Sequence, residues 1–321
     1  MTVLVTGDAG FVAATLVRRL LDRGRRVLAV DNLSRGCLQN LGASISRDRF
    51  SLLPADIADL AVFRTALIGH DWGRSVTEVW HLAANSDIQA GIRDPQVDLR
   101  DTFLTTFNTL ILMAGLGIGR LYFASSSAIY GDHGDQPLFE NIGPLLPISN
   151  YGAMKLASEA AISAAAEKFL QRALLFRFPN VVGVPATHGV IRDFILRLRQ
   201  DPLCPQVVGN GTQRKAYLHV SDLVDAMLFL ANSYDGKIAP FNIGPADDGV
   251  TVRFIEEQTI AVVAPEATIE FGQGDRGWVG DVPRFRYDVR RLQGLGWRLT
   301  LDSAGAVRQA IREIAQEEAA A

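Results

Sequence analysis

The chain has 321 residues, of which 48% are apolar and 21% charged, and its formal net charge is −3 at pH 7. This composition suits one large or two moderate globular domains, and the lack of a net basic charge argues against nucleic acid as a partner. The two cysteines, Cys37 and Cys204, form no CxxC pair and the five histidines form no HExxH pattern, so neither a disulfide framework nor a metal site is expected. The sequence shows no signal-peptide pattern and no apolar run long enough to cross a bilayer, so we expect a cytoplasmic protein without membrane contact.

The first apolar run, residues 2–6, leads into the glycines Gly7 and Gly10 and then at once into a helical pattern. A strand, a glycine turn and a helix in this order can hold the diphosphate of a dinucleotide. Glycine lets the backbone come close, and the helix N-terminus presents free N–H groups. The spacing is TGxxGxxA rather than GxGxxG, with Ala13 in place of the third glycine. Alone, this turn is a weak signal.

A second apolar run, residues 26–30, ends in Asp31 and strengthens this interpretation. An acid about 20 residues beyond the turn, at a strand end, binds the hydroxyls of the adenosine ribose. Because its carboxylate repels a 2′-phosphate, we expect NAD rather than NADP, although the nearby Arg35 leaves NADP open. An ordinary strand–turn–helix with a surface aspartate is disfavoured, because strand, glycines, helix and acid all occur in order.

From residue 1 to about 180, strand and helix patterns alternate, which predicts an α/β fold with a doubly wound, Rossmann-like parallel sheet. The expected strands are 2–6, 26–30, 50–54, 76–80, 119–124 and 172–177, and the expected helices lie near 10–23, 58–68, 95–117 and 149–168. Beyond residue 180, glycine and proline become frequent and the elements shorten. We therefore expect a cofactor domain over 1–180, to which 217–245 return with a helix at 221–233 and a strand at 240–243, and a smaller substrate domain over 181–216 and 246–321.

Ligands of such sheets bind at the carboxyl ends of the strands. After the third strand, Asp56 is placed to hold an adenine amino group and Ile57 to pack on its ring; for Asp56, a role as a helix N-cap is equally plausible. The fourth strand ends in HLAAN (81–85), whose small residues let the backbone run along a cofactor. His81 itself suits a packed core position better than catalysis.

The fifth strand ends in three serines, Ser125 to Ser127, which offer hydroxyls to a polyhydroxylated substrate or simply favour a turn. Tyr151 and Lys155 begin the next helix, and their spacing places them side by side on one face. A free tyrosine, with a pKa of about 10, is a poor base at neutral pH. A neighbouring ammonium and a cationic nicotinamide favour the phenolate, so Tyr151 can take a hydroxyl proton as hydride leaves the same carbon. A chance surface pair is the alternative, but the glycine turn and the serine cluster upstream make it less plausible.

Together, TGDAGF, Asp31, HLAAN, SSSAIYG and YGAMK resemble the extended short-chain dehydrogenase/reductase family, the NAD-dependent nucleotide-sugar epimerases and dehydratases. The similarity continues through RFPNVVG (177–183), THGVI (187–191), GNGTQRKAYLHVSD (209–222) and RGWVGDVP (276–283), and so covers nearly the whole chain. The resemblance implies a tightly bound NAD that is used and regenerated within one turnover. It also implies a homodimer formed through the helices near 95–117 and 149–168, unless their apolar faces are buried within the monomer.

The resemblance further implies residue roles. Tyr151 would be the base and acid, Lys155 would lower its pKa and hold the nicotinamide ribose, and Ser126 would bind the oxygen being oxidised, with Ser127 as a further catalytic candidate. The expected cofactor-binding residues are Gly7, Ala9, Gly10, Phe11, Val12, Asp31, Asn32, Asp56, Ile57, Leu82, Ala83, Ala84, Tyr151, Lys155 and Phe178. The expected substrate-binding residues are Asn85, Ser126, Asn180, His188, Val190, Lys215, Arg276 and Asp281. Among these, Asn180, Lys215 and Arg276 would meet the diphosphate or ribose of a nucleotide sugar.

The chain also departs from the family pattern. Lys215 replaces an arginine, so bidentate phosphate binding would be lost there, and Met154 replaces a small residue, which would reshape the sugar pocket. The 4,6-dehydratases of the family carry an Asp-Glu pair directly after the active hydroxyl, where this chain has Ser127 and Ala128. The acid and base that those enzymes use to remove water are therefore absent from these two positions.

Three functions follow from this comparison. The first is a 4-epimerase of a UDP-hexose or UDP-N-acetylhexosamine, which needs only Tyr151, Lys155, Ser126 and NAD. The second is a dehydratase that eliminates water across C5–C6 of UDP-N-acetylglucosamine in antibiotic or glycan biosynthesis, as in tunicamycin-type nucleosides. The third is a non-catalytic NAD-binding sensor, which the presence of both Tyr151 and Lys155 disfavours.

Overall fold

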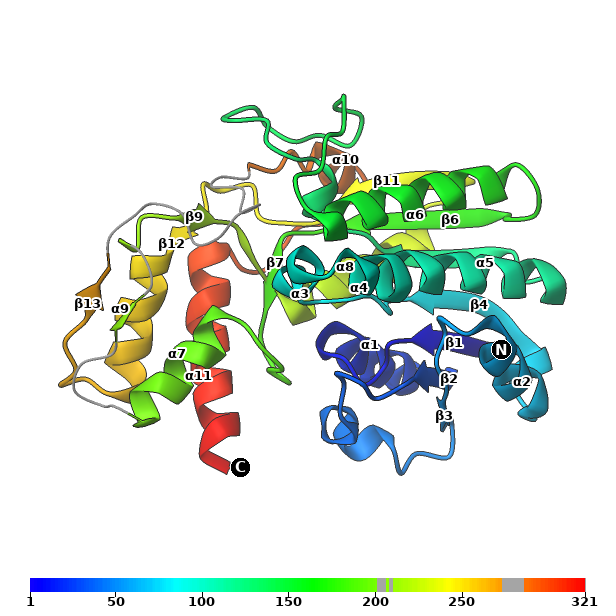
Figure 1. The fold of residues 1–321 in the computed structure, drawn as a ribbon, viewed down its shortest axis with the longest axis horizontal. Coiled ribbons are helices and arrows are strands. Elements are labelled where there is room, and N and C mark those ends of the chain that lie inside the picture. The colour runs from blue at the N-terminus through cyan, green and yellow to red at the C-terminus, as the bar shows by residue number, and fades with distance from the viewer. Residues whose placement is uncertain (201–205, 208–209, 273–285, 321) are drawn as a thin grey trace. The chain divides into compact units, whose positions relative to one another are not determined.

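The protein, as a computed structural model, is described over residues 1–200, 206–207, 210–272 and 286–320. Its main sheet has seven strands in the order β11-β6-β5-β4-β1-β2-β3 (Figure 1). The strands are β1 (Thr2–Thr6), β2 (Arg26–Asp31), β3 (Phe50–Pro54), β4 (Val76–His81), β5 (Arg120–Ala124), β6 (Arg172–Arg177) and β11 (Ile238–Asn242). Every pair from β6 to β3 is parallel, which confirms the predicted fold. The strand order reverses beside β1, so the ligand crevice of a doubly wound sheet is expected at its carboxyl end.

The chain divides into two compact units. The first comprises Met1–Gly131, Gly143–Arg177 and Met227–Phe241, and the second comprises Asp132–Ile142, Phe178–Ala226 and Asn242–Ala321. The sequence predicted a cofactor domain over 1–180 with 217–245 returning to it. When residues are grouped by their contacts, the returning segment is shorter, Met227–Phe241, and Asp132–Ile142 belongs to the second unit. There Leu138 forms an isolated β-bridge with Tyr287.

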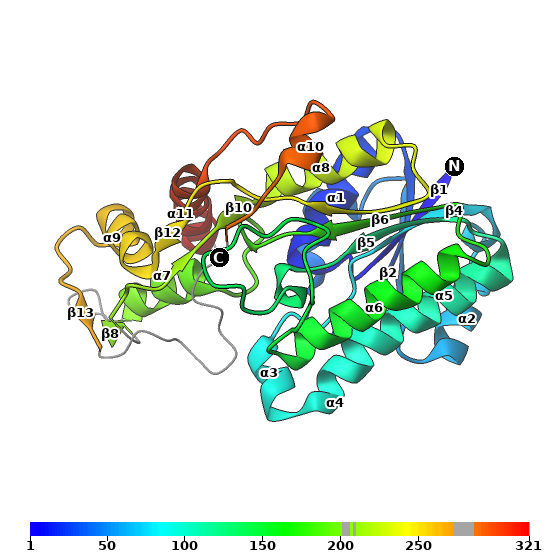
Figure 2. The ribbon, with the colours of Figure 1, turned by 90° about the horizontal axis from the view of Figure 1, so that it is seen from above.

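Helices cover both faces of the sheet in the first unit. They are α1 (Phe11–Asp22), α2 (Leu60–Gly69), α3 (Ile88–Arg93), α4 (Pro95–Asp98), α5 (Thr105–Leu116), α6 (Asn150–Ala166) and the second half of α8 (Val220–Ser233), with 3-10 turns at η1 (Leu38–Ser44), η2 (Gly73–Ser75) and η4 (Ser127–Ile129). Figure 2 shows α2, α5 and α6 on one face of the sheet, and α1 with α8 on the other. The single helix expected at 95–117 is divided by a π-helical segment, η3 (Leu99–Leu104), a feature that often accompanies functional sites.

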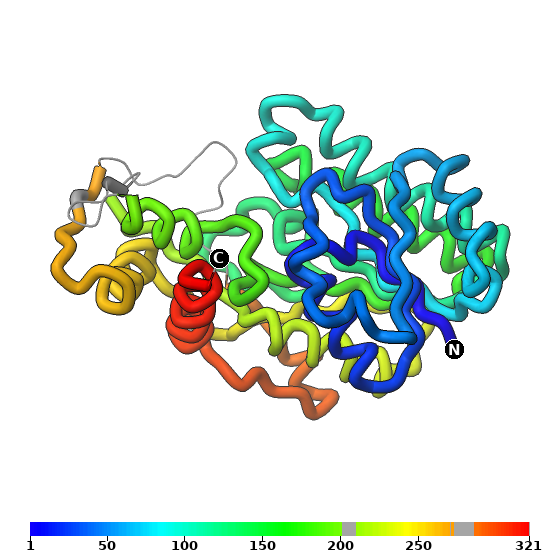
Figure 3. Tube along the Cα trace, turned by 90° about the horizontal axis from the view of Figure 1, so that it is seen from below, coloured from blue at the N-terminus to red at the C-terminus, as the bar shows by residue number. Residues whose placement is uncertain are grey.

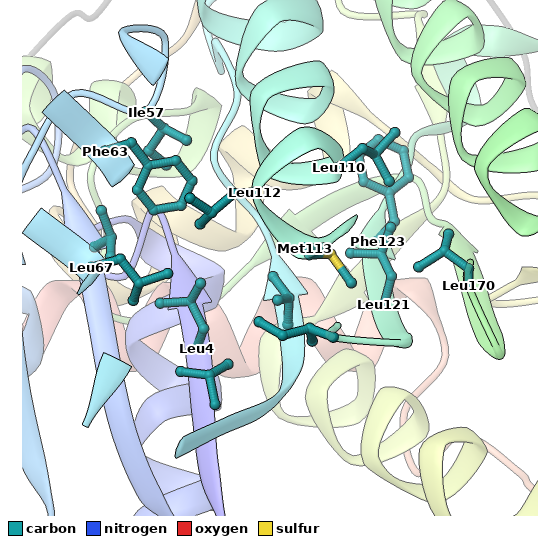
Figure 4. Close-up of a cluster of buried hydrophobic side chains, with 14 of the residues drawn as sticks. Leu4, Ile57, Phe63, Leu67, Leu110, Leu112, Met113, Leu121, Phe123 and Leu170 are labelled. Carbon is teal, nitrogen blue, oxygen red and sulfur yellow. The ribbon is translucent and has the colours of Figure 1, made fainter. Parts of the chain in front are cut away.

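The core of the first unit lies between the sheet and helices α2, α5 and α6. In Figure 4, Phe63 of α2 meets Leu112 of α5, and Met113 of α5 lies over Leu121 of β5. Each such side chain contributes about 1.5–3 kcal/mol by leaving water. This packing holds the carboxyl ends of the strands in fixed positions, and the candidate site is built there.

The second unit is organised around three helices, α7 (Val190–Gln200), α9 (Val252–Val263) and α11 (Ser303–Ala320), which pack on one another (Figure 3). Its other elements are β7 (Asn180–Val182), β8 (Gln206–Val207), β9 (Arg214–Lys215), β10 (Tyr217–His219), β12 (Val250–Thr251), β13 (Glu270–Phe271) and α10 (Arg290–Gly294). The short strands pair as β7 with β10, β9 with β12 and β8 with β13. Across the described ranges, no helix combines the length and hydropathy needed to span a bilayer, and no His, Cys, Asp or Glu cluster is arranged to hold a metal.

Candidate active site

The glycine turn after β1 forms a cradle against the loop after β4. Gly7 has φ +72°, and a Cβ there would lie 2.8 Å from the backbone N and Cα of Ala83. Gly10 precedes α1 without a side-chain cap, so the first N–H groups of this helix have no capping side chain. Close backbone approach together with free N–H groups suits an anionic diphosphate. The residues present therefore fit a dinucleotide cofactor.

Asp31 is tied to this turn by two backbone hydrogen bonds. Its Oδ2 accepts the N–H of Ala9 at 3.1 Å, and its Oδ1 accepts the N–H of Leu33 at 2.7 Å. Burial raises the pKa of Asp31, while the two backbone hydrogen bonds oppose that rise. The carboxyl group lies beside the turn at the end of β2, where an adenosine ribose is expected, and the neighbouring Asn32 is exposed.

Asp8, a residue of the turn to which the sequence reasoning gave no role, is fully buried. Neither of its carboxyl oxygens has a hydrogen-bond partner among the described residues. Burial, with the charge of Asp31 as a second cause, raises the pKa of Asp8 from its ordinary value of 3.8 to about 8. The group is therefore mostly protonated at neutral pH.

The loop after β3 corrects one of the two explanations offered for Asp56. Asp59, not Asp56, caps α2, because its Oδ1 accepts the N–H groups of Ala61 at 2.9 Å and Val62 at 3.0 Å. The N-cap alternative for Asp56 is therefore wrong. Asp56 instead accepts the N–H of Ala58 and pairs with Arg100. Ile57, expected to pack on the adenine, is only 4% exposed.

His81 is a packed core residue, as expected. The N–H groups of Leu82 and Ala83 donate to Thr6 Oγ1 at 3.2 and 3.3 Å, so the Thr6 hydroxyl is free to donate to His81 Nδ1 at 2.7 Å. Nε2 then carries the proton and donates to Thr106 Oγ1 at 3.0 Å. Burial lowers the pKa of His81 to about 3, so the ring is neutral. This chain of bonds fixes the loop after β4, whose residues Leu82 to Ala84 stay partly exposed beside the turn.

Asn85 was expected to bind substrate, but its side chain is used within the protein. It is 1% exposed. Its amide donates to Asp98 Oδ1 and to the carbonyl of Asp87, both at 2.8 Å, and its Oδ1 accepts the N–H of Asp87 at 2.9 Å and an Nη1–H of Arg35 at 3.3 Å. No polar atom of the Asn85 side chain is left for a sugar in this structure. We therefore assign Asn85 to positioning the loop rather than to contacting substrate.

The three serines after β5 differ in their surroundings. Ser125 donates to Glu159 and is buried, and Ser127 is 8% exposed at the start of η4. Ser126 is partly exposed and forms a side-chain hydrogen bond with Tyr151. A Cβ at Gly152 would lie 2.3 Å from the carbonyl oxygen of Ala128, so η4 and the first turn of α6 are in close contact. Of the two serines expected to be catalytic, Ser126 is thus the one paired with the tyrosine.

Lys155 is buried one turn further along α6, at 2% exposure. Its Nζ donates to the carbonyl of Ala124 at 2.6 Å and lies 5.8 Å from the centre of the Tyr151 ring. Burial lowers the pKa of Lys155 to about 7, and the carboxylates of Glu159 and Asp98 oppose this shift. The ammonium is therefore only partly populated at neutral pH in the protein alone.

The pKa of Tyr151 is raised to about 12, chiefly by burial and also by the charge of Asp98, while the hydrogen bond from Ser126 lowers it. The resemblance assigned the lowering of this pKa to Lys155. In this structure the hydrogen bond from Ser126 lowers it. A phenol of this pKa needs further positive charge nearby before it can act as a base at neutral pH.

A set of buried groups that sequence reasoning did not identify supports this pair. Arg177, at the end of β6, holds both oxygens of Glu159, with Nε–Oε1 at 2.9 Å and Nη2–Oε2 at 2.6 Å, and also donates to the hydroxyl of Tyr130 at 3.1 Å. Asp98 is fully buried, and its Oδ2 has no partner among the described residues. Glu159 lies four residues after Lys155 on α6, so helical spacing alone could have indicated it.

Phe11 and Val12 are the first two residues of α1, and the remaining expected binding residues belong to the second unit. Phe178 follows β6 directly and is partly exposed. Asn180 of β7 pairs in register with Tyr217 of β10, and Lys215 precedes Tyr217 by two residues in the chain. His188 is exposed just before Val190, the first residue of α7. Arg276 and Asp281 lie outside the described residues.

A parallel sheet with a glycine cradle, an aspartate beside it at the end of the next strand and a Ser–Tyr–Lys group at its carboxyl edge is typical of an NAD-dependent enzyme that oxidises and reduces a hydroxyl-bearing substrate. The chain belongs to the NAD dependent epimerase/dehydratase family, whose model matches residues 3–244. This confirms the resemblance to extended short-chain dehydrogenases and the expectation of NAD as cofactor.

The epimerases among the known relatives match over nearly the full chain. The UDP-glucose 4-epimerase of Corynebacterium glutamicum is 30% identical over 334 residues, covering 94% of this chain and 96% of the relative. UDP-glucuronic acid decarboxylase 1 of Arabidopsis thaliana is 28% identical over 279 residues, covering 84% of this chain and 60% of the relative. A crystal structure of UDP-galactose 4-epimerase is 34% identical, with a TM-score of 0.85 and 99% of each chain covered.

Proposed function

We propose that the protein is an NAD-dependent 4-epimerase of UDP-hexoses or UDP-N-acetylhexosamines. The observation that carries this proposal is the Ser126–Tyr151 hydrogen bond with Lys155 beside it, in a chain that has Ser127 and Ala128 where an elimination enzyme carries an acid and a base. The epimerase relatives, which match over nearly their full length, support it.

The residues divide the work of one reversible oxidation. Ser126 binds the substrate hydroxyl and orients its proton toward Tyr151, which accepts it as the alcohol becomes a ketone and returns it when the ketone is reduced. Lys155 adds positive charge beneath the tyrosine and anchors the cofactor. NAD, held by the glycine turn and Lys155, would supply the hydride acceptor and donor for this oxidation, and its positive charge would favour the phenolate. The 4-keto sugar turns within the site before reduction, so the product differs from the substrate only at C4.

The direct test is to incubate the purified protein with UDP-glucose and UDP-N-acetylglucosamine separately in deuterated water. Mass spectrometry and NMR should show an unchanged mass, an inverted C4 and no deuterium incorporation. Loss of one water, or deuterium at C5 or C6, would establish the dehydratase instead. Conversion of neither sugar, combined with loss of carbon dioxide from UDP-glucuronic acid, would establish a decarboxylase.

The serine pair offers a matched test within the site. We expect Ser126→Ala to lower kcat by roughly 10- to 100-fold and to shift the pH–rate profile upward, because the hydrogen bond that lowers the Tyr151 pKa is lost. Ser127→Ala, one residue away, should lower kcat by less than about 3-fold, because Ser127 makes no such bond to the tyrosine. A larger loss in Ser127→Ala, or an unshifted profile in Ser126→Ala, would contradict the assignment.

We also propose that the protein forms a homodimer through η3 and α5. Leu99, Phe107 and Ile111 leave 39%, 44% and 42% of their surfaces exposed at spacings of four and eight residues, which supports an apolar contact face. Phe107→Glu should convert the dimer to a monomer in light scattering. Val62→Glu, a control at a side chain on α2 that is 45% exposed, should not. A monomeric wild-type protein would refute the proposal.

A further inference from the structure

Arg35 reaches from the loop after β2 to the loop after β4. Its Nη1 lies 3.3 Å from Asn85 Oδ1 and 3.8 Å from Asp87 Oδ2. Because β1 lies between β2 and β4 in the sheet, a side chain joining these two loops passes over the carboxyl end of β1. The glycine turn begins there.

The segment that carries Arg35 is fastened to the glycine turn. A Cβ at Gly36 would lie 2.6 Å from the carbonyl carbon of Ala9, and the N–H of Cys37 donates to the Ala9 oxygen at 3.2 Å. The amide of Asn40 donates to the same oxygen at 2.6 Å. The backbone that carries Arg35 is therefore fixed beside the glycine turn, while the Arg35 side chain is 45% exposed and able to move.

The present partners hold the guanidinium only loosely. A distance of 3.3 Å is beyond the usual range for an N–H···O bond, and 3.8 Å to Asp87 is a contact between charges without a hydrogen bond. Neither partner depends on Arg35. Asn85 Oδ1 also accepts the N–H of Asp87, and Asp87 also pairs with Arg93 and caps α3 through the N–H of Ala90. Movement of Arg35 would leave no buried group without a partner.

We infer that Arg35 exchanges these contacts for the diphosphate of the bound dinucleotide and closes over it. The cradle supplies N–H groups but no charge, and the nearby side chains Asp31 and Asp87 are acidic, so the diphosphate needs a cation on its open side. A guanidinium can bind two phosphate oxygens at once, and such a pair of charged hydrogen bonds is stronger than the present long contact between Arg35 and the neutral amide of Asn85. The same placement means that Arg35 recognises the diphosphate that NAD and NADP share, not the 2′-phosphate that distinguishes them.

The test is the affinity of nucleotide-free protein for NAD, ADP, adenosine and NADP, measured by calorimetry. Arg35→Ala and the neutral Arg35→Gln should bind NAD and ADP about 10- to 100-fold more weakly, with adenosine affinity within about twofold of wild type. Arg93→Ala is the matched control, because Arg93 contacts the same Asp87 oxygen at 3.8 Å, and it should leave NAD affinity unchanged. Circular dichroism confirms that each variant is folded.

Three results would overturn the inference. If Arg35→Ala binds NAD as wild type does, Arg35 does not contact the cofactor. If adenosine affinity falls as much as ADP affinity, Arg35 shapes the loop instead of binding the diphosphate. If only NADP affinity falls, Arg35 recognises the 2′-phosphate.

Discussion

Replacing Tyr151 by phenylalanine is expected to lower kcat by about 10²–10⁴-fold while NAD and the nucleotide sugar still bind. The change removes only the hydroxyl that Ser126 contacts and that exchanges the proton of the substrate alcohol. The ring, which lies 5.8 Å from Lys155 Nζ, remains in place. Steady-state conversion of the UDP-sugar, together with the NAD content of the purified variant, measures both halves of this expectation.

Tyr122→Phe is the matched control for this variant. Tyr122 lies in β5, is 2% exposed, and its hydroxyl takes no part in the site. It should retain kcat within about threefold of wild type, because the hydroxyl that it removes is not at the reacting atoms. Should Tyr151→Phe keep more than about a tenth of the wild-type rate, another group must move the proton, and the assignment of Tyr151 would be wrong.

The second large effect concerns stability and pH. Asp8→Asn is expected to raise the free energy of unfolding by roughly 2 kcal/mol at pH 5 and roughly 5 kcal/mol at pH 8. The cause is the rise in the Asp8 pKa from 3.8 to about 8, which burial produces. Between these two values the folded protein binds a proton that the unfolded chain does not hold, so wild-type stability falls as pH rises through this window. Asparagine, which cannot ionise, removes that cost.

Thermal unfolding of nucleotide-free protein at several pH values checks the sign and the size of this effect. The Tm of Asp8→Asn should exceed that of wild type by about 5–10 °C at pH 8, and the difference should shrink toward pH 4. Asp71→Asn, at an exposed aspartate, should follow wild type at every pH. A difference that does not depend on pH would show that Asp8 is not kept protonated by the fold.

The sequence predicted the fold well because each buried strand is a short, continuous apolar run. The strands at 2–6, 50–54 and 172–177 are found at the predicted residues. The glycine turn and the Tyr151–Lys155 pair were also predictable, because their geometry depends on neighbours in the chain: one turn of backbone for the first and one turn of helix for the second. Local patterns of this kind fix local structure.

What the sequence did not reveal depends on partners far apart in the chain. Asn85 is occupied by Asp98, 13 residues away, and by Arg35, 50 residues away, so its burial could not be inferred from HLAAN alone. Likewise, the choice of Asp59 over Asp56 as the cap depends on which residue begins α2, and a difference of two or three residues lies within the ordinary error of helix boundaries. The orphaned carboxyl of Asp8 becomes visible only when the turn is folded.

The most direct test of the central claim follows the hydrogen at C4 of the sugar. UDP-glucose carrying deuterium at C4 is incubated with the enzyme in ordinary water, and the product is examined by NMR and mass spectrometry. If Tyr151 moves only the hydroxyl proton while NAD carries the hydride away and returns it, the product is inverted at C4 and keeps its deuterium. An inverted product that has lost the label to water would show that C4 is not the site of a returned hydride, and the proposed mechanism would fail.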